Sequence, residues 1–468
     1  MTRTKIIATI GPKTANSKDL KNLINAGADI FRLNGSHSNF LWHANTIKQI
    51  RKISQEIPIL FDVPGRKIRT TELNFEHKFS RNQIIKLVPY SVTETKEKIP
   101  INILNLADKL ETGQIVFADD GTLMFEVASI DGRVVNLRAR NTGELKSKKG
   151  INIPNSQNNI YKLSRKDHEM LEFVAKFDID MVGMSFVDNA KQISNFRKSL
   201  PASYNPQLVS KIENSLGYKN MEEIIKNSEM IMIDRGDLSV ETNLHTVTLF
   251  QKEIITKSRD FNVPVIVATE VLHTMIQNKY PTKAEISDIT NSVLDGASAI
   301  MLSGETAIGN YPIEAVITLA KTIQSVEQFN SNNFDIVNDV KSFAESIASL
   351  SHFYGATKII TLTRTGYLPK LLSQVDISLE ILAVTTNLKT FRKMKIFRGI
   401  TPLLTKIEFN KSDLNHVVKI LEELYLKKKL TLRDKVLVTS VGYPTSKTKT
   451  NTIQILSIIE LKRKFDWN

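Results

Sequence analysis

KIIATIG (residues 5–11) is the first of eight short apolar runs, each of which ends in a polar residue suited to chemistry. Each run is too short and too rich in β-branched residues for a buried helix, and a segment with helical spacing follows each one. Strands that alternate with helices predict a parallel sheet, and eight such units predict a closed (β/α)8 TIM barrel. The other seven runs are ADIFRLN (28–34), IPILFDV (57–63), MVGMSFV (181–187), LVSKIEN (208–214), MIMIDRGD (230–237), PVIVATE (264–270) and AIMLSGE (299–305).

The ends of these runs carry charged and polar side chains. In a parallel barrel the carboxyl ends of all strands share one rim, so residues that end different strands converge on one pocket. A barrel that used these positions only for stability would have little need of charge there, and the sequence therefore predicts an enzyme. The residues at the predicted rim are Arg32, Asn34, Asp62, Lys211, Glu213, Asp237, Thr269 and Glu305.

Composition limits the class of protein. The chain has 468 residues, which predicts two or three domains, and no cysteine, which excludes disulfides, thiolate catalysis and cysteine-ligated zinc. No apolar stretch is long enough to span a membrane and no signal sequence precedes the first strand, so we expect a cytoplasmic protein. The net charge of +14 comes from scattered lysines without an aromatic-interleaved basic stripe, so neither a nucleic acid nor a membrane is expected as a partner.

The strand–helix rhythm divides the chain into three domains. Between the third and fourth runs, short alternating segments and the turn signals Asp120-Gly121 and Asp131-Gly132 predict a small β-barrel. Because it is inserted at the rim, this domain is placed to act as a lid. After residue 330, further strand-like runs with helices between them predict a doubly wound α/β domain. The expected domains are the barrel (1–62 and 160–330), the lid (63–159) and the C-terminal domain (338–468).

Lys211, Glu213 and Asp237 form the most informative local pattern. In a strand, residues i and i+2 point the same way, so Lys211 and Glu213 both face the barrel mouth. Asp237 arrives from the adjacent strand end. Two carboxylates from neighbouring strands, in a chain with few histidines, suit a hard cation with oxygen ligands such as Mg²⁺ or Mn²⁺.

Two arginines complete the chemical pattern. Arg32 ends the second run and Arg69 follows the third, and arginine binds phosphate through a rigid bidentate fork. Thr269 is placed to orient a substrate or a proton, whereas His37 is interpreted as a turn residue. A metal, two arginines and a lysine, without a histidine base, favour phosphoryl transfer or enolate chemistry.

Over nearly its whole length the chain resembles the pyruvate kinase family. The matching segments include SKIENSLG (210–217), IMIDRGDL (231–238) and PTKAEISDITNSVLDGASAIMLSGETAIGNYP (281–312), and the last of these is close to diagnostic. The resemblance implies transfer of phosphate from phosphoenolpyruvate to ADP, giving pyruvate and ATP in the last step of glycolysis. These two small molecules would be its substrates, Mg²⁺ or Mn²⁺ its cofactor, and a homotetramer its assembly.

The resemblance also implies a role for each rim residue. Catalysis and substrate binding would fall to Arg32, Lys211, Gly236, Asp237 and Thr269, and Mg²⁺ binding to Glu213 and Asp237. The nucleotide would be held by Asn34, His37, Arg69 and the lid residue Lys149.

The potassium site of the family is altered in this chain. Lys67 stands where potassium-dependent members have a glutamate, and Val63 stands where they have a cation-ligating threonine. Asn34, Ser36 and Asp62 remain. We therefore expect Lys67 to substitute for the ion, and K⁺ not to be required.

Four other positions depart from the family pattern. Gly35 replaces a phenylalanine and Lys283 an arginine, while Asp234 replaces an alanine and Glu270 a glutamine. The last two add negative charge near the metal and the substrate, which predicts weaker binding of phosphoenolpyruvate.

An effector site is expected only in outline. Thr363, Thr365 and Gly366 lie in a turn that resembles the phosphate-cradling turn of the family's effector site. The later loop GYPTSK (442–447) lacks most of the glycines that such a loop generally carries. A fructose bisphosphate, another phosphate ester and no effector all stay open.

Two alternatives compete with this interpretation. One is another barrel enzyme of phosphoenolpyruvate chemistry, a mutase or an aldolase-like lyase, although such an enzyme needs no nucleotide clamp of the kind that Lys148 and Lys149 form. The other is a catalytically weak or inactive paralogue with a binding or regulatory role. Retention of Lys211, Glu213 and Asp237 argues against it, because neighbouring carboxylates are costly to keep without a metal.

Overall fold

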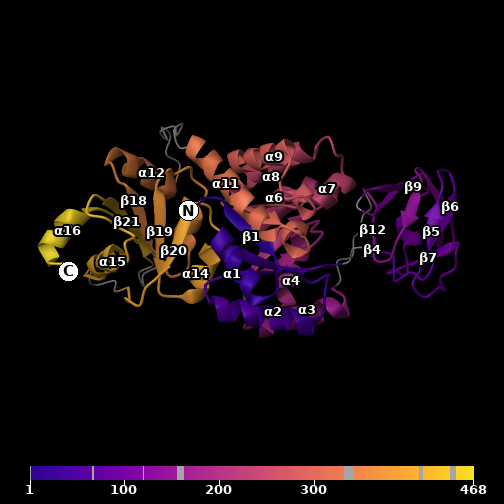
Figure 1. Ribbon diagram of the computed structural model, residues 1–468, viewed down its shortest axis with the longest axis horizontal. Helices are drawn as coiled ribbons and strands as arrows, with labels where there is room; N and C mark the ends of the chain where they lie inside the picture. The colour runs from indigo at the N-terminus through magenta and orange to yellow at the C-terminus, as the bar shows by residue number, and fades with distance from the viewer. Residues whose placement is uncertain are drawn as a thin grey trace.

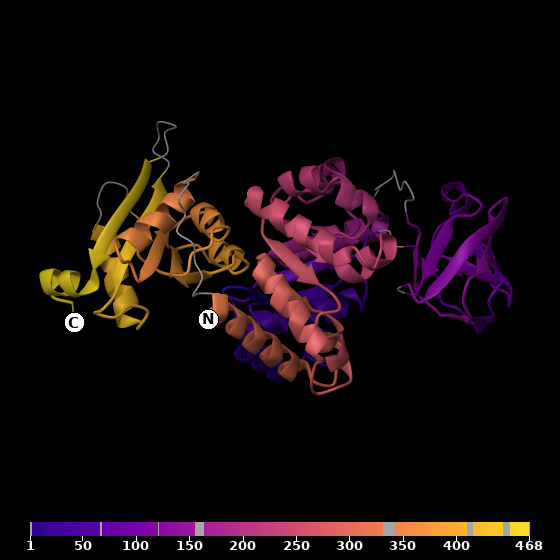
Figure 2. The same cartoon turned by 90° about the horizontal axis from the view of Figure 1, so that it is seen from above.

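The computed structural model describes residues 2–65, 68–119, 121–154, 163–330, 342–409, 415–442 and 450–467. Three units lie in a row, with a barrel in the middle, a β domain at one end and an α/β domain at the other (Figure 1). The view from above shows the same order, with the β domain standing apart from the barrel (Figure 2).

The eight predicted apolar runs form one closed parallel barrel. The ring order is β1-β17-β16-β15-β14-β13-β3-β2. Its strands are β1 (Lys5–Thr9), β2 (Ile30–Asn34), β3 (Ile59–Val63), β13 (Met181–Met184), β14 (Gln207–Ile212), β15 (Met230–Asp234), β16 (Val265–Ala268) and β17 (Ala299–Leu302). The TIM barrel prediction is therefore confirmed.

Helices surround the barrel, and local sequence explains where several of them begin. The side chains of Asn16, Asn39, Ser164, Asn189 and Thr282 each accept a hydrogen bond from the backbone of the first turn, which satisfies donors that the helix itself cannot pair. The longer helices are α1 (Ser17–Ala26), α2 (Phe40–Ile53), α3 (Arg165–Lys176), α4 (Ala190–Lys198), α8 (Val247–Asp260), α9 (Lys283–Asp295) and α11 (Pro312–Asn330). Shorter ones are α5 (Ser215–Lys219), α6 (Met221–Lys226), α7 (Arg235–Glu241), η2 (His273–Ile276) and α10 (Gly304–Ala307).

Both faces of the barrel strands are apolar. In β1, Ile6 and Ala8 pack in the core beneath the helices, whereas Ile7 belongs to a second core in the barrel interior. That interior core is continuous with residues of the C-terminal domain such as Phe397 and Ile400. The closed end of the barrel is therefore fastened to the C-terminal domain, and the opposite rim is left for chemistry.

The inserted β domain lies beyond that rim. Its strands form a seven-stranded sheet in the order β4-β12-β8-β9-β10-β6-β7 and a two-stranded sheet, β11-β5. Gly121 and Gly132 have positive φ values of 83° and 56°, which only glycine adopts readily, at the two predicted turns. The elements are β4 (Ile68–Arg69), β5 (His77–Phe79), β6 (Ile84–Pro89), β7 (Lys98–Ile101), η1 (Ala107–Lys109), β8 (Ile115–Ala118), β9 (Leu123–Asp131), β10 (Val134–Ala139), β11 (Gly143–Leu145) and β12 (Gly150–Asn152).

The C-terminal domain is a five-stranded sheet, ordered β20-β19-β18-β21-β22, with helices on both faces. The strand-like runs predicted here were TKIITLT (357–363), LEILAVTT (379–386), KVLVTSV (435–441) and IQILSII (453–459). They form β18 (Lys358–Leu362), β19 (Glu380–Thr385), β21 (Lys435–Gly442) and the antiparallel β22 (Thr450–Ser457). The strand β20 (Ile400–Leu404) was not predicted. It contains Pro402, which is tolerated because β20 lies at the sheet edge. The helices are α12 (Phe343–Phe353), α13 (Tyr367–Leu372), α14 (Leu388–Met394), α15 (Asn415–Leu426) and α16 (Ile458–Phe465).

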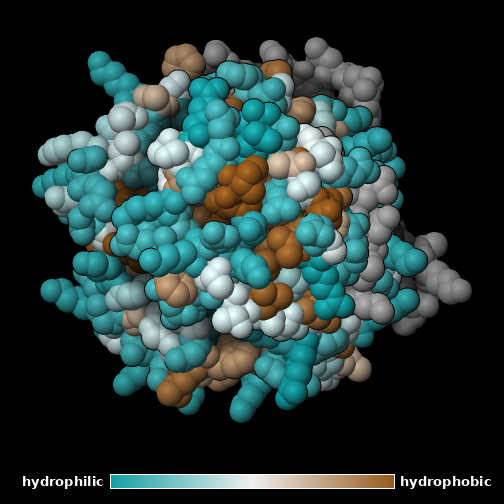
Figure 3. Space-filling model, turned by 90° about the vertical axis from the view of Figure 1, so that its right-hand side faces the viewer, coloured by the Kyte–Doolittle hydropathy of each residue, from teal (hydrophilic) through white to brown (hydrophobic). Residues whose placement is uncertain are grey.

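The surface at the β-domain end is largely hydrophilic (Figure 3). Seen from the β-domain end, that face is mostly polar, with hydrophobic side chains gathered near its middle and a few others toward its edges (Figure 3). Among the described residues, no helix has both the length and the apolar character that crossing a membrane requires.

Candidate active site

A buried cluster of charges lies at the barrel rim. Lys211 is the fifth residue of β14, and its Nζ lies 2.7 Å from Glu213 Oε1 and 3.4 Å from Asp234 Oδ2. It also donates to Ser185 Oγ at 3.3 Å. Lys211, Glu213 and Asp234 are 5%, 1% and 7% exposed. The strand pattern therefore did place Lys211 and Glu213 together, as predicted.

The charged form of each group depends on its neighbours. Burial opposes a charged Lys211, but the carboxylates of Glu213, Asp62 and Asp234 outweigh this effect and raise the pKa of Lys211 above its usual range. Burial also raises the pKa of Glu213 to about 8; Lys211 counteracts this rise, whereas Asp234 and Asp237 add to it. Lys211 is thus a permanent cation beside carboxylates that are crowded by their own negative charge.

The carboxylates fit a divalent metal ion. Glu213, Asp234 and Asp237 each offer an oxygen, and these oxygens lie within 4.8 Å of one another. Mg²⁺ binds oxygen at about 2.1 Å in an octahedron, so its ligands lie roughly 3 to 4 Å apart. The donor set is therefore hard, anionic and close to the required spacing.

A buried ion pair holds Arg32. Its Nε and Nη2 lie 2.8 Å and 2.6 Å from Asp62 Oδ2, and its Nη1 donates to Thr9 Oγ1 at 3.2 Å. Gly183 on the neighbouring strand β13 pairs with Asp62 in the register, and a Cβ added at this glycine would lie 2.0 Å from Asp62 Oδ1. The glycine thus makes room for the carboxylate that orients Arg32.

Thr269 is held in an unusual backbone conformation next to the carboxylates. Thr269 and Glu270 have φ values of 64° and 53°, in the left-handed region that non-glycine residues seldom adopt. The Arg235 guanidinium donates to both of their carbonyls and pairs with Asp288 at 2.6 Å. Thr269 Oγ1 accepts from the Gly236 amide at 2.9 Å and donates to Asp234 Oδ1 at 3.0 Å.

Three site residues escaped the sequence analysis. Ser185 accepts from Lys211, and the backbone amide of Phe186 donates to Glu213 Oε2 at 2.6 Å. The backbone of Phe186 is left-handed, with a φ of 52°. Arg235 stabilises the turn at Thr269 by donating to its backbone carbonyl. All three lie at ends of predicted strands, so strand position was the available signal. Phe186 acts through its backbone amide and Arg235 binds backbone carbonyls, so these contacts leave no pattern of paired side chains in the sequence.

Glu305 serves a structural purpose. Its carboxylate accepts hydrogen bonds from the backbone amides of Leu272 and Ser303, at 3.0 Å and 2.8 Å. It therefore orders the rim and, unlike Lys211, carries no ion pair among the described contacts.

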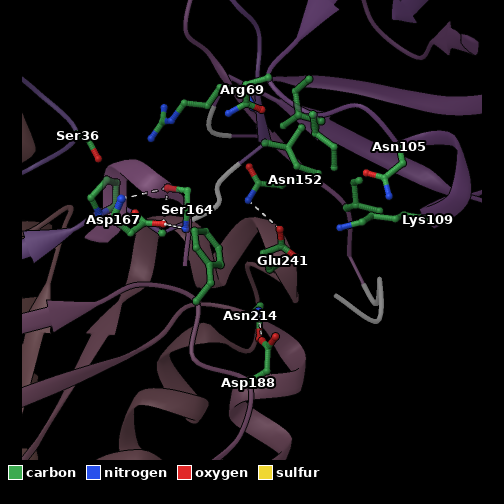
Figure 4. Close-up of a pocket in the computed structure, with 18 of the residues that line it drawn as sticks. Ser36, Arg69, Asn105, Lys109, Asn152, Ser164, Asp167, Asp188, Asn214 and Glu241 are labelled. Carbon is green, nitrogen blue, oxygen red and sulfur yellow. Dashed lines mark hydrogen bonds between the residues drawn. The ribbon is translucent and has the colours of Figure 1, made fainter. Parts of the chain in front are cut away.

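A pocket of about 740 Å³ opens between the β domain and the rim (Figure 4). Arg69 projects into it from the β domain, and Ser36 and Asp188 line its barrel side. Burial raises the pKa of Asp188, whose carboxylate accepts hydrogen bonds from Asn214 and Gln192 that counteract the rise. Phe186 also lines the pocket, so the pocket adjoins the Lys211–Glu213 cluster.

Of the predicted nucleotide residues, Arg69 lines this pocket. Partial burial lowers the pKa of His37, and the nearby positive charges of Arg69 and Arg32 lower it further. Arg69 Nη1 donates to the Lys148 carbonyl at 3.2 Å. Lys149 instead pairs within the β domain, 2.6 Å from Asp119. Lys149 therefore does not reach the rim in this arrangement.

Two predicted sites are incompletely described. Of the altered potassium site, Asn34, Ser36, Asp62 and Val63 are placed at the ends of β2 and β3, whereas Lys67 lies outside the described residues. In the C-terminal domain Gly366 has a φ of 78° and donates to Thr363 Oγ1 at 2.9 Å, with Thr365 exposed beside it. Most of the 442–447 loop lies outside the described residues.

Comparison with known proteins agrees with the architecture. Residues 1–316 match the family model described as pyruvate kinase, barrel domain, and residues 341–456 match pyruvate kinase, alpha/beta domain. A pyruvate kinase of Thermotoga maritima is 30% identical over 473 residues, covering 98% of this chain and 100% of that protein. A pyruvate kinase of Hypocrea jecorina is 34% identical over 485 residues, covering 97% and 90% respectively. Pyruvate kinase 2 of a Synechocystis species is 35% identical over 418 residues, covering 86% and 70%.

Proposed function

The chain belongs to the pyruvate kinase family, and from this premise we propose how its rim residues divide the work of the reaction. It is a phosphotransferase that moves the phosphoryl group of phosphoenolpyruvate to ADP, giving pyruvate and ATP. The bond from phosphorus to the enol oxygen breaks, a bond to the terminal ADP oxygen forms, and the enolate that is left takes up a proton at carbon. Negative charge therefore develops at two places, on the phosphoryl oxygens and on the enolate.

In the mechanism that we propose, Lys211 has the main catalytic role. It is a fixed ammonium in a dry site, so it stabilises the developing charge without the reorganisation that water would need. Arg32, oriented by Asp62, binds the phosphoryl oxygens with its fork. The Asp237 amide and Thr269 would hold the substrate carboxylate, with the Gly236 amide joining them when it exchanges its bond to Thr269 Oγ1 for the substrate. Thr269 would also orient the enolate for protonation.

The family requires a divalent metal, and Glu213 and Asp237 are the proposed ligands. A bound Mg²⁺ or Mn²⁺ would act as a Lewis acid that polarises phosphoryl and enol oxygens. Lys211 and the Phe186 amide keep Glu213 in place, because each contacts one of its carboxylate oxygens.

The nucleotide is proposed to bind between the rim and the β domain. Arg69 lines the pocket, and His37 lies close enough to Arg69 for that positive charge to act on it. Asn34 is two residues before the pocket-lining Ser36, and a cationic side chain here suits the ADP phosphates. Lys149 would join them only if its pair with Asp119 is exchanged for a phosphate as the lid closes.

We further propose that K⁺ is not required. Val63 offers no side-chain oxygen, and the Oδ1 atom of Asp62 is buried without a hydrogen-bond partner among the described residues, so a tethered ammonium would suit this position. Two cations a few Å apart repel by about 4 kcal/mol at an effective dielectric near 20, so Lys67 and K⁺ should exclude each other. We expect less than twofold activation by KCl in a tetramethylammonium background at fixed ionic strength. Tenfold activation would contradict the proposal, and Lys67→Glu with Val63→Thr should create a potassium requirement.

A cytoplasmic homotetramer is proposed from family membership. Exposed aromatic side chains on helices are consistent with it, since Phe353 and Phe329 are 79% and 72% exposed. Light scattering should give a tetramer at micromolar concentration, and a monomer there would reject it.

The observation that supports the function best is the Lys211–Glu213 pair beside Asp237. The experiment therefore tests whether Glu213 and Asp237 bind the divalent metal. Purified enzyme should form pyruvate from phosphoenolpyruvate only with ADP and Mg²⁺. Glu213→Gln and Asp237→Asn should each raise the Mg²⁺ concentration needed for half-maximal activity, because a neutral amide loses charge that holds a hard cation. An unchanged Mg²⁺ requirement in both variants would remove this pair from the metal site.

A further inference from the structure

Asp234 gives this rim a third carboxylate. The two metal ligands proposed above are Glu213 and Asp237, and an Asp234 oxygen lies within 4.8 Å of an oxygen from each of them. We propose that Asp234 is a further ligand of the divalent cation, and that it lets the free enzyme bind metal tightly before any substrate is present. This inference rests on the proposed metal site and adds to it a residue that sets how tightly the free enzyme binds the metal.

The position of Asp234 suits this role. It is the last residue of β15 and directly precedes α7, so its side chain is presented at the same rim as Glu213 and Asp237. It is only 7% exposed, and its Oδ2 lies 3.4 Å from Lys211 Nζ. Its Oδ1 accepts from Thr269 at 3.0 Å, which fixes the rotation of the carboxylate. An ionised carboxylate has about four acceptor sites, so these contacts are compatible with a metal bond.

The charge balance points to a divalent cation. With a divalent cation bound, all three carboxylates are ionised; together with the Lys211 ammonium they sum to a charge of −2, which one Mg²⁺ or Mn²⁺ neutralises. The nearby Arg32–Asp62 pair is already neutral. With an apolar residue at position 234 the same count would be −1, and the occupied site would be left with a net positive charge. Because buried like charges repel, the third carboxylate makes the metal-free state less favourable and the metal-bound state more so.

A third carboxylate makes binding of the metal less dependent on bound substrate. A site with two carboxylates relies on substrate oxygens to hold the cation, whereas more anionic ligands raise the affinity of the protein alone. We therefore expect metal to bind this enzyme without phosphoenolpyruvate or ADP. The anionic substrates then enter a neutral site rather than a positive one.

The test measures Mn²⁺ binding to the full chain without substrates, from the electron paramagnetic resonance signal of free Mn²⁺. Asp234→Asn and Asp234→Ala should each raise the Mn²⁺ dissociation constant by tenfold or more, and Glu213→Gln should do the same. Asp188→Asn is the matched control, since Asp188 is a buried rim carboxylate held by Asn214 and Gln192 and lies outside the three-carboxylate cluster. It should bind Mn²⁺ within twofold of the wild type. A cooperative thermal transition in EDTA establishes that each variant is folded.

Three results overturn the inference. If both Asp234 variants bind Mn²⁺ within twofold of the wild type while Glu213→Gln binds weakly, Asp234 is not a ligand and the proposed function stands. If Asp234→Ala alone weakens binding, the negative charge of Asp234 does not hold the cation, because asparagine retains an oxygen but not the charge. If neither Glu213→Gln nor the Asp234 variants weaken binding, the proposed metal site itself fails.

Discussion

Replacing Lys211 by methionine should separate the two tasks of this residue, stabilising the rim and catalysing the reaction. Methionine is similar in volume and apolar, so it removes the ammonium without opening a large cavity. The ammonium lies 2.7 Å from Glu213 and 3.4 Å from Asp234, and all three groups are buried. The variant therefore leaves neighbouring carboxylates without their cation.

The magnitude follows from these distances. At an effective dielectric near 20, the two contacts correspond to attractions of about 6 and about 5 kcal/mol. Structural relaxation and proton uptake by Glu213 offset part of the lost attraction. Removing one partner of a buried ion pair therefore typically lowers stability by about 3–5 kcal/mol. For a barrel of this size we expect the midpoint of thermal unfolding in EDTA to fall by roughly 6–20 °C. Saturating Mg²⁺ should restore most of this loss, because a cation again occupies the carboxylates.

Turnover should respond differently. Losing one preorganised charge donor costs roughly 10²- to 10³-fold in kcat, and Mg²⁺ should not restore it. The assays are thermal unfolding with EDTA or Mg²⁺, and pyruvate formation at saturating substrates. Lys226→Met, which removes a lysine from an exposed helical pair, should change neither. Turnover within threefold of the wild type, or an EDTA midpoint that does not move, would refute the reasoning.

Two further variants test other parts of the structure. Gly183→Ala should lower kcat/KM for phosphoenolpyruvate by tenfold or more and lower stability by about 1–3 kcal/mol. The reason is that the added Cβ would lie 2.0 Å from Asp62 Oδ1 and displace the Arg32–Asp62 ion pair. Steady-state kinetics that match the wild type would contradict this. In the β domain, burial raises the pKa of Glu94, but hydrogen bonds from the Asn74 and Phe75 amides and from His77 lower it overall. Its stabilisation is therefore present above the unfolded pKa near 4.3 and is lost as pH falls through the folded value. Glu94→Gln should cost about 1–3 kcal/mol at pH 7, and the difference in thermal midpoint from the wild type should shrink below about pH 4; a difference that stays constant with pH would exclude this role.

Much of the fold could be predicted from local pattern. The eight barrel strands all lie within the apolar runs, and the turns at Gly121 and Gly132 fall where their dipeptides predicted. The exception, β20, shows the limit of this approach: Pro402 counts against a strand until the sheet order places that strand at an edge. Edge position is a property of the assembled sheet, and no local window contains it.

A buried strand appears in the sequence as a short apolar run, so the sequence alone was enough to identify the barrel strands. Because parallel strands end at one rim, the sequence also predicted that Arg32, Lys211 and Glu213 converge there. The contacts that tune the rim join residues far apart in the chain, and only the folded structure specifies them. The Phe186 amide reaches Glu213, and Arg235 holds the Thr269 turn through backbone carbonyls. Asp234 was recognised as an added charge, but its contacts with Lys211 and Thr269 depend on strand register and side-chain direction. Each of these contacts requires separate strands to close into one ring, so local pattern does not encode them.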